Sequence, residues 1–330
     1  MKIIKSLLGM AVAAGLSFTA TPGFAVGPAP APLATPVKLT IGYVKVGHLA
    51  PLSLVPEETK KLGVEIELVE FSRYADARTA LLAGSLDAAA VAPADLAISL
   101  AQGSTNMVGI MGVGGSKKYV IGRKGVKLDS WEDLKGKKVA IGPGSAVWFQ
   151  FAATVTEKGV PYNSFQAINI QGGGANFNQA LQRGEVDAIV CWEPFESIPV
   201  LEGYGFFAKN LEYSESKAVG AELGMIAASR KAVETKRDAV ERFVWAYIKA
   251  QETLSADPAR FADSYARLTG VDPRIATEAS KLITLGAVIS PEQLERQAKA
   301  FADLGVIQKD MSGEIRKYWD ASFVAKATGR

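Results

Sequence analysis

Cysteine and histidine are almost absent from this sequence, and their scarcity argues against several kinds of chemistry. The 330 residues include one cysteine, Cys191, and one histidine, His48. One cysteine cannot form an intramolecular disulfide, and no His-x-His, His-Glu-x-x-His or Cys-x-x-Cys spacing indicates a metal centre. A nucleophilic Cys191 would need an oriented base and an oxyanion hole, so a buried, inert thiol is the favoured interpretation. We therefore predict no catalytic residue, no metal and no cofactor.

The sequence also lacks a large excess of charge of either sign. Lys and Arg total 37 against 34 for Asp and Glu, which leaves a formal net charge of +3. The basic residues form no single tract, and binding to nucleic acid depends on such a tract or on a strong basic excess. Nucleic acid is therefore excluded as the expected partner. Apolar residues make up 48% of the chain, enough for sizeable cores.

The N-terminus has the pattern of an export signal. Lys2 and Lys5 precede an apolar stretch over residues 7–20, and Gly23-Phe24-Ala25 offers small residues for cleavage. We predict cleavage near Ala25 and a periplasmic protein without a lipid anchor, since no cysteine lies near this position. An uncleaved anchor is the alternative, although no stop-transfer flank follows. Residues 26–36 contain four prolines and are predicted to form an extended, poorly packed leader.

A pattern in the first third of the chain returns after 100 residues. Ile41-Gly42 recurs as Ile141-Gly142, and the acid of Gly84-x-x-Asp87 recurs in Gly184-x-x-Asp187. The order of apolar runs and helix-length segments around these residues repeats as well. The repeat predicts two similar, Rossmann-like α/β lobes, and the crevice between two such lobes is a natural ligand site.

The expected elements divide between these two lobes. In the first, strands are predicted at residues 37–42, 66–71 and 86–91, and helices at 50–62 and 75–83. In the second, strands are predicted at 119–121, 139–141, 167–170 and 186–190, and helices at 146–158 and 176–183. An apolar run at 219–228 returns the chain to the first lobe, and residues 231–330 are predicted to be a helical tail. Lobe 1 is thus expected to comprise residues 37–116 and 219–330, and lobe 2 residues 117–218.

Five motifs, in this order, carry a resemblance to a known family. They are Gly42-Tyr43, Ala83-Gly84-Ser85-Leu86-Asp87, Leu134-Lys135-Gly136-Lys137-Lys138-Val139-Ala140, Gly142-Pro143-Gly144-Ser145 and Asp187-Ala188-Ile189-Val190-Cys191-Trp192-Glu193-Pro194. Through them the chain resembles the periplasmic binding proteins (type 2 fold) of the sulfonate, taurine and nitrate class of ABC importers. The resemblance implies two lobes joined by a hinge that close on a small solute, deliver it to an inner-membrane permease and carry out no chemistry. We also expect a monomer.

The candidate ligand site lies in the loops that follow the predicted strands, since doubly wound sheets bind ligands there. Ser145 and Ala146, and Gly174 and Ala175, stand where two of these loops open helices, whose N–H groups suit an anion. An ordinary N-cap and a flexible glycine turn are the structural alternatives. Arg73, within Phe71-Ser72-Arg73-Tyr74, is either the counter-ion of a sulfonate or carboxylate or a solvated surface residue.

Other candidates concern the body of the ligand. Gly47 and His48 occupy the loop after the first strand, where the resembling family contacts its ligand, and His48 is either a neutral hydrogen-bonding group or structural. Trp148 or Trp192 is expected to cover the ligand. Glu193, helped by Asp95 or Glu222, is expected to attract an ammonium group or to stabilise only its own helix. Together they indicate a small organic anion or zwitterion, of the taurine type or an acid with a polar donor, ahead of nitrate.

Two other classes of function stay open at this point. One is an enzyme on the same scaffold, similar to the fungal-type pyrimidine synthase, although the cysteine-rich segment expected of that enzyme is lacking here. The other is an exported sensor-binding module that passes its ligand to a receptor instead of a permease.

Overall fold

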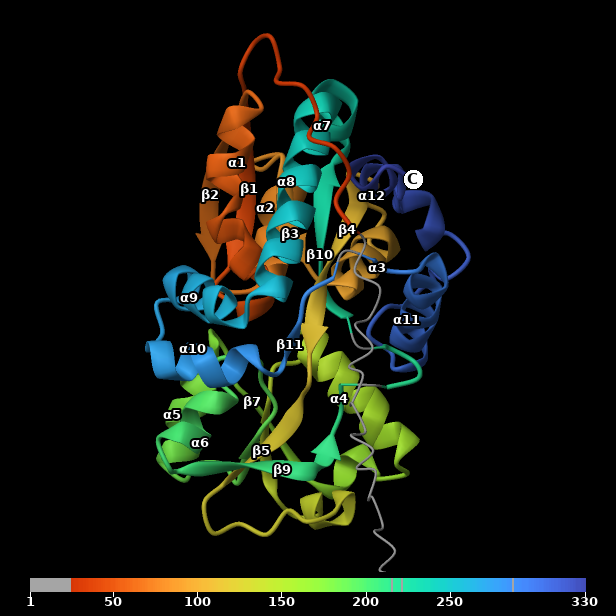
Figure 1. The fold of residues 1–330 in the computed structure, drawn as a ribbon. Coiled ribbons are helices and arrows are strands. Elements are labelled where there is room, and N and C mark those ends of the chain that lie inside the picture. Colours follow the sequence, from red (N-terminus) through yellow and green to blue (C-terminus); the bar gives the residue numbers. More distant parts are fainter. Residues whose placement is uncertain (1–24, 215, 221, 287) are drawn as a thin grey trace, which may run out of the picture.

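Two separate β-sheets, one above the other, organise the computed structural model in Figure 1. The structure describes residues 25–214, 216–220, 222–286 and 288–330, so residues 1–24 of the export signal predicted at residues 1–25 lie outside the described residues. The first sheet has the strand order β11-β4-β10-β3-β1-β2, and the second has the order β7-β6-β8-β5-β9. Both sheets mix parallel and antiparallel pairs and carry helices, which makes the structure α/β as predicted.

The first sheet is built from both ends of the chain. Its strands are β1 (Val37–Val44), β2 (Val64–Phe71), β3 (Ala88–Val91), β4 (Met107–Ser116), β10 (Glu222–Ser229) and β11 (Ile283–Thr284). Strand β1 pairs in parallel with β2 and β3, while β10 runs antiparallel between β3 and β4. The apolar run predicted to return the chain to the first lobe is therefore a central strand of the first sheet.

Alternation along the strands supplies the two faces of this sheet. In β3, Ala88 and Ala90 pack on one side and Ala89 and Val91 on the other, as the two-residue period of a strand requires. The helices of this lobe are α1 (Val55–Lys61), α2 (Tyr74–Leu82), α3 (Pro93–Ala101), α7 (Arg230–Thr235), α8 (Arg237–Ala256), α9 (Pro258–Thr269), α10 (Pro273–Ser280), α11 (Pro291–Asp303) and α12 (Ser322–Thr328). Helices α1 and α8 share a core on one face, and α2, α3 and α11 share a core on the other.

The second sheet lies entirely within the middle of the chain. Its strands are β5 (Tyr119–Arg123), β6 (Lys138–Ile141), β7 (Gln166–Asn169), β8 (Ala188–Ile189) and β9 (Gly205–Glu212), and its helices are α4 (Ala146–Glu157), α5 (Gly174–Gln182) and α6 (Ser197–Leu201). Short 3-10 helices complete the chain at η1 (Gly47–Ser53), η2 (Trp131–Leu134), η3 (Tyr162–Ser164) and η4 (Ile315–Tyr318). Helices α4 and α5 pack on opposite faces of this sheet.

The repeated acids, Asp87 and Asp187, have the same structural role in the two sheets. Asp87 accepts a hydrogen bond from the Thr40 N–H at 3.0 Å, and Asp187 accepts one from the Lys138 N–H at 3.0 Å. The spacing from Thr40 to Lys138 is two residues shorter than the spacing between the acids. The 100-residue repeat therefore holds for β3 and β8 but not for β1 and β6, and Gly142 lies two residues further along its strand than Gly42 does.

Two further expectations need correction. The single helix predicted at residues 50–62 is η1 followed by α1, because Pro51 and Pro56 lack the N–H that a continuous α-helix needs. The leader is extended but is not poorly packed. The Gly27 N–H donates to the Ala327 carbonyl at 2.8 Å, and the Gly27 carbonyl accepts from the Trp245 indole N–H at 2.9 Å.

We expect removal of this leader to destabilise the first sheet. A protein that begins at Val37 loses the two Gly27 bonds and the bonds from Arg242 to the Ala31 carbonyl. Each Gly27 hydrogen bond contributes about 1 kcal/mol net and the solvent-exposed bonds to Ala31 contribute less, so the free energy of unfolding should fall by at least about 2 kcal/mol. Urea unfolding of the proteins that begin at Val26 and at Val37 measures this difference. Equal midpoints would show that the packing of the leader adds nothing to stability.

Candidate functional site

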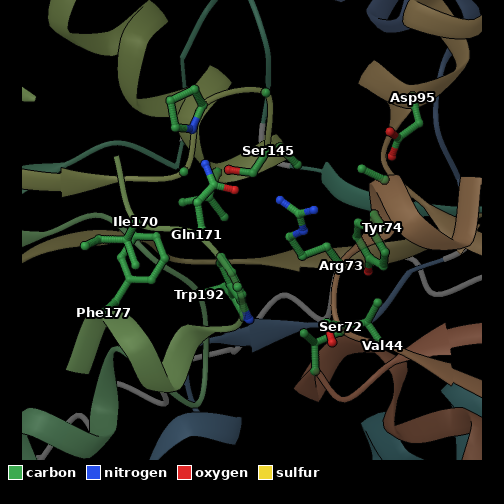
Figure 2. Close-up of a pocket in the computed structure, with 18 of the residues that line it drawn as sticks. Val44, Ser72, Arg73, Tyr74, Asp95, Ser145, Ile170, Gln171, Phe177 and Trp192 are labelled. Carbon is green, nitrogen blue, oxygen red and sulfur yellow. The ribbon is translucent and has the colours of Figure 1, made fainter. Parts of the chain in front are cut away.

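A cavity of about 110 Å³ lies between the lobes, at the carboxyl ends of β1, β2, β6 and β7. Figure 2 shows its two walls, with Val44, Ser72, Arg73, Tyr74 and Asp95 on the side of lobe 1 and Ser145, Ile170, Gln171, Phe177 and Trp192 on the side of lobe 2. Six of the predicted site residues line it: His48, Arg73, Asp95, Ser145, Ala146 and Trp192. Strand ends of both sheets thus supply the site, which is where sequence reasoning looked for it.

The N-terminus of α4 faces this cavity. Ser145 is its N-cap, and the Ser145 Oγ accepts a hydrogen bond from the Trp148 N–H at 3.2 Å. The cap leaves the hydroxyl hydrogen of Ser145 available, so capping and ligand binding are compatible roles. Within the described residues, the N–H groups of Ala146 and Val147 donate to no protein acceptor. A twelve-residue helix therefore presents free donors and the positive end of its dipole to the cavity.

Arg73 supplies the positive charge of the cavity. It is the only cationic side chain among the described residues that line it, and Figure 2 shows it extending from lobe 1 toward Ser145 and Gln171. Its guanidinium lies 3.3 Å from the carboxylate of Asp76, and 45% of the Arg73 side chain is exposed. An exposed ion pair of this kind is weak. An anion in the cavity can therefore compete with Asp76 for Arg73.

A neutral pair, His48 and Tyr74, forms the floor on the side of lobe 1. The His48 Nε2 and the Tyr74 hydroxyl are 2.5 Å apart. Burial, together with the charge of Lys118, lowers the pKa of His48 to about 3, so the imidazole is neutral at pH 7. Burial also raises the pKa of Tyr74. Gly224 lies beneath the pair, since a Cβ there would come within 3.0 Å of the Tyr74 hydroxyl and 3.2 Å of the His48 Nε2.

Asp95 lines the cavity but is already paired. Its carboxylate lies 2.8 Å from the Arg78 guanidinium and accepts a hydrogen bond from the Ala92 N–H at 2.8 Å. Burial raises the pKa of Asp95, and the charge of Arg78 opposes that rise. The carboxylate therefore caps α3 and neutralises Arg78, and it offers no unpaired negative charge to a ligand.

Trp192 forms the apolar wall of lobe 2. Its ring meets Phe177 edge-on at a centroid distance of 5.9 Å and Phe195 at 6.0 Å. Phe177 and Ile170 continue this wall within the cavity. Aromatic rings held edge-to-face keep a fixed orientation, so the wall offers a rigid apolar surface.

Five further predicted site residues do not line the cavity: Gly47, Trp148, Gly174, Ala175 and Glu193. Gly47 and Gly174 are required by close packing elsewhere. A Cβ on Gly47 would overlap Tyr265 and Ile283, and a Cβ on Gly174 would overlap the Phe195 ring. Ala175 follows Gly174 in the first turn of α5. The Trp148 indole N–H instead donates to the Tyr162 hydroxyl at 2.7 Å. Glu193 is buried and accepts hydrogen bonds from Ser197, and Glu222 belongs to β10.

Several lining residues were missed by sequence reasoning. Tyr74 directly follows Arg73 and lines the cavity, although it is not among the predicted site residues. Asn169 is the last residue of β7, Gln171 lies two residues beyond it, and the Gln171 side chain donates to Asn169 at 3.0 Å. The Asn176 side chain donates to the Gln171 carbonyl at 2.7 Å, which holds this loop against α5. The signal for these residues was their position just after a strand.

Metal and membrane features receive no support from the part of the chain that the structure describes. No group of three or more His, Cys, Asp or Glu side chains is placed to hold a metal ion there. No described helix is both long enough and apolar enough to cross a bilayer. Cys191 is fully buried away from the cavity lining, and burial raises the pKa of its thiol well above the usual range.

Comparison with known proteins identifies the class. A model of the NMT1-like family matches residues 33–269, and the chain belongs to this family. A Bacillus subtilis (strain 168) protein named as an aliphatic sulfonates-binding protein is 25% identical over 289 residues, 84% of this chain and 85% of that protein. The family match and this relative confirm the resemblance seen in the motifs.

Solved structures agree with this assignment at the level of the fold. The alkanesulfonate-binding protein SsuA from Xanthomonas axonopodis pv. citri, bound to MOPS, has a TM-score of 0.74 at 20% identity and covers 88% of this chain and 100% of its own. The periplasmic nitrate-binding protein NrtA from Synechocystis PCC 6803 has a TM-score of 0.73 at 15% identity. The match covers 91% of this chain and 90% of the NrtA chain. The periplasmic binding protein fold predicted from sequence is thus confirmed.

The His48–Tyr74 contact makes a testable contribution to stability. Tyr74→Phe removes the hydroxyl and leaves the buried His48 Nε2 without that partner. Because an unsatisfied buried polar group costs about 1–3 kcal/mol, the free energy of unfolding at pH 7 should fall by that amount. Tyr119→Phe is the control, since its hydroxyl has no hydrogen-bond partner among the described residues. Equal losses in the two variants would contradict the role given to the pair.

Proposed function

We propose that this protein is the extracytoplasmic solute-binding protein of an ABC importer, which captures a small organic anion in the interlobe cavity and delivers it to an inner-membrane permease. The observation that carries the proposal is the pairing of the α4 N-terminus with Arg73 across the cavity. The names of the relatives, binding proteins for aliphatic sulfonates, alkanesulfonates and nitrate, support it. Those relatives are named as binding proteins, and we propose that the solute leaves unchanged.

The anionic end of the solute lies between the lobes in this proposal. Ser145 and the N–H groups of Ala146 and Val147 donate to its oxygens from lobe 2, and Arg73 approaches from lobe 1. A sulfonate or carboxylate suits this arrangement because it has several acceptor oxygens and can use helix donors and a guanidinium together. Both lobes then hold the same group, and a solute that joins them favours the closed arrangement.

The body of the solute is uncharged in this proposal. Trp192, Phe177 and Ile170 offer it an apolar wall, and the neutral His48–Tyr74 pair offers hydrogen bonds without charge. An ammonium group would need a carboxylate, but Asp95 is paired with Arg78, and Glu193 does not line the cavity and is hydrogen-bonded to Ser197. We therefore place a monoanion with a neutral body ahead of the taurine-type zwitterion that the sequence suggested.

Calorimetry with a matched pair of solutes tests this choice. Propanesulfonate should bind at least about tenfold more tightly than 3-aminopropanesulfonate, because the unpaired ammonium loses its hydration without gaining a counter-charge. Preference for the amine would contradict the proposal and restore the zwitterion. Recovery of a chemically altered solute would instead indicate an enzyme.

Two substitutions locate the solute. Arg73→Gln should weaken propanesulfonate by at least about tenfold, since hydrogen bonds to charged groups contribute roughly 1.5–3 kcal/mol. Trp192→Ala should cost on the order of 2 kcal/mol of binding free energy, as for a packed aromatic anchor. Arg183→Gln, an exposed arginine at the far end of α5, is the matched control and should leave the affinity unchanged. If Arg73→Gln binds as the wild type does, Arg73 is not the counter-ion.

Closure of the lobes has its own measurement. The chain crosses between the sheets twice, after β4 and after β9, and two short crossovers can absorb a modest rotation. Small-angle scattering with a saturating solute should show a smaller radius of gyration than without it. An unchanged scattering profile would contradict closure.

A further inference from the structure

A cluster of buried ionisable side chains lies beside the cavity, where the chain crosses between the lobes. Its members are Lys118, Cys191, Glu193, Glu196, Tyr213 and Tyr265. Lys118 and Glu196 are fully buried, and Glu193 is 3% exposed. The proposed function uses none of these six groups. Charged side chains are rarely buried to this extent without a purpose or a partner.

Four separate elements bring the cluster together. Lys118 stands in the crossover from β4 to β5, and Tyr213 stands in the crossover from β9 to β10. Glu193 and Glu196 belong to the turn after β8, and Tyr265 belongs to α9. Two cavity residues connect the cluster to the ligand site. Trp192 directly precedes Glu193, and His48 is close enough to Lys118 for that charge to lower the pKa of the imidazole.

The hydrogen bonds of the cluster are incomplete within the described residues. The Lys118 ammonium donates to the Ser116 hydroxyl and lies within 4.0 Å of no described carboxylate. Glu193 accepts from the Ser197 hydroxyl at 2.8 Å and from the Ser197 N–H at 3.2 Å. Glu196 Oε1 accepts from the Tyr213 hydroxyl at 3.3 Å, but its Oε2 and the Tyr265 hydroxyl have no protein partner there. A partly satisfied network of this kind is sensitive to a change of charge.

One group in the cluster changes its charge near neutral pH. Burial raises the pKa of Glu193 to about 7, although Ser197 and Lys118 oppose that rise. Burial raises the pKa of Glu196 well above its usual range, and the neighbouring Glu193 adds to this rise. The pKa values of Cys191, Tyr213 and Tyr265 are also raised by burial, so these groups stay neutral. His48 is neutral as well, and its pKa of about 3 lies far below this range.

We propose that Glu193 links solute capture to pH, so that the cavity holds its anionic solute more tightly when Glu193 is protonated. This inference rests on the proposed function, which makes the solute an anion. Ionised Glu193 adds a negative charge at the residue next to the cavity-lining Trp192, in a buried and weakly screened environment. By linkage, an anion in the cavity favours the proton on Glu193, and the proton favours the anion.

Calorimetry with propanesulfonate between pH 6 and pH 8 tests the link. The sulfonate stays ionised throughout, so the solute contributes no titration of its own. The wild-type affinity should be about fivefold higher at pH 6 than at pH 8, the low end of common coupling strengths. Glu193→Gln should give one affinity at all three pH values, 6, 7 and 8, close to the wild-type value at pH 6. Glu196→Gln is the matched control and should keep the wild-type profile, while Ser197→Ala should move the midpoint to higher pH.

A second measurement needs no solute. Because the folded-state pKa of Glu193 is raised from 4.5 to about 7, its contribution to stability is full below pH 4.5 and is lost as the pH rises through 7. The melting temperature of the wild type relative to Glu193→Gln should therefore fall between pH 5 and pH 8. A constant difference would overturn the assignment of Glu193 as the titrating group.

The outcomes separate this inference from the function on which it rests. Binding that does not change with pH would overturn the link and leave the proposed function standing. No binding of sulfonates or carboxylates at any pH would overturn the proposed function, and the link with it. A Glu193→Gln protein that keeps the wild-type pH profile would place the titration elsewhere and overturn the inference.

Discussion

The hydrogen bond from the Tyr213 N–H to the Lys118 carbonyl, 3.0 Å long, joins the two segments on which the arrangement of the lobes depends. Each segment carries the chain from one sheet to the other, and the bond keeps them side by side. The parallel strands of both sheets consequently end at the same crevice, so that loops from distant parts of the sequence share one cavity. A second contact also joins the lobes: Phe149 of α4 packs on Phe301 of α11, with the ring centroids 4.1 Å apart.

Much of the fold could be predicted because its signals are local. The alternation in β2 and the Gly-x-x-Asp pattern before β3 and β8 identify strands and turns without knowledge of their neighbours. The packing of the leader could not be predicted in this way. Its prolines indicate an extended chain, but whether that chain is packed depends on Trp245 and Arg242, which lie more than 200 residues further along.

For the site, the sequence indicates which loops contribute residues but not how the side chains of those residues are oriented. Sequence reasoning pointed to loops that line the cavity, because strand ends are recognisable, and it thereby included Ser145, Arg73 and Trp192. It left open whether Glu193 attracts an ammonium group or stabilises only its own helix, because spacing does not show which way adjacent side chains in a turn point. Trp192 faces the cavity, whereas Glu193 turns back to Ser197. Asp95 reached the cavity as expected, but its partner Arg78 lies on another helix and could not be inferred from spacing.

The hydrogen bond between Gly27 and Ala327 also determines which part of the molecule is held when the protein is linked to a surface or to another protein. Both segments belong to the layer around the first sheet, and Figure 1 shows the chain passing beside α12 there. The second sheet carries neither segment. A tether, a surface immobilisation or a fused reporter joined at either position would hold only one half of the molecule, and the other half would keep its freedom to swing.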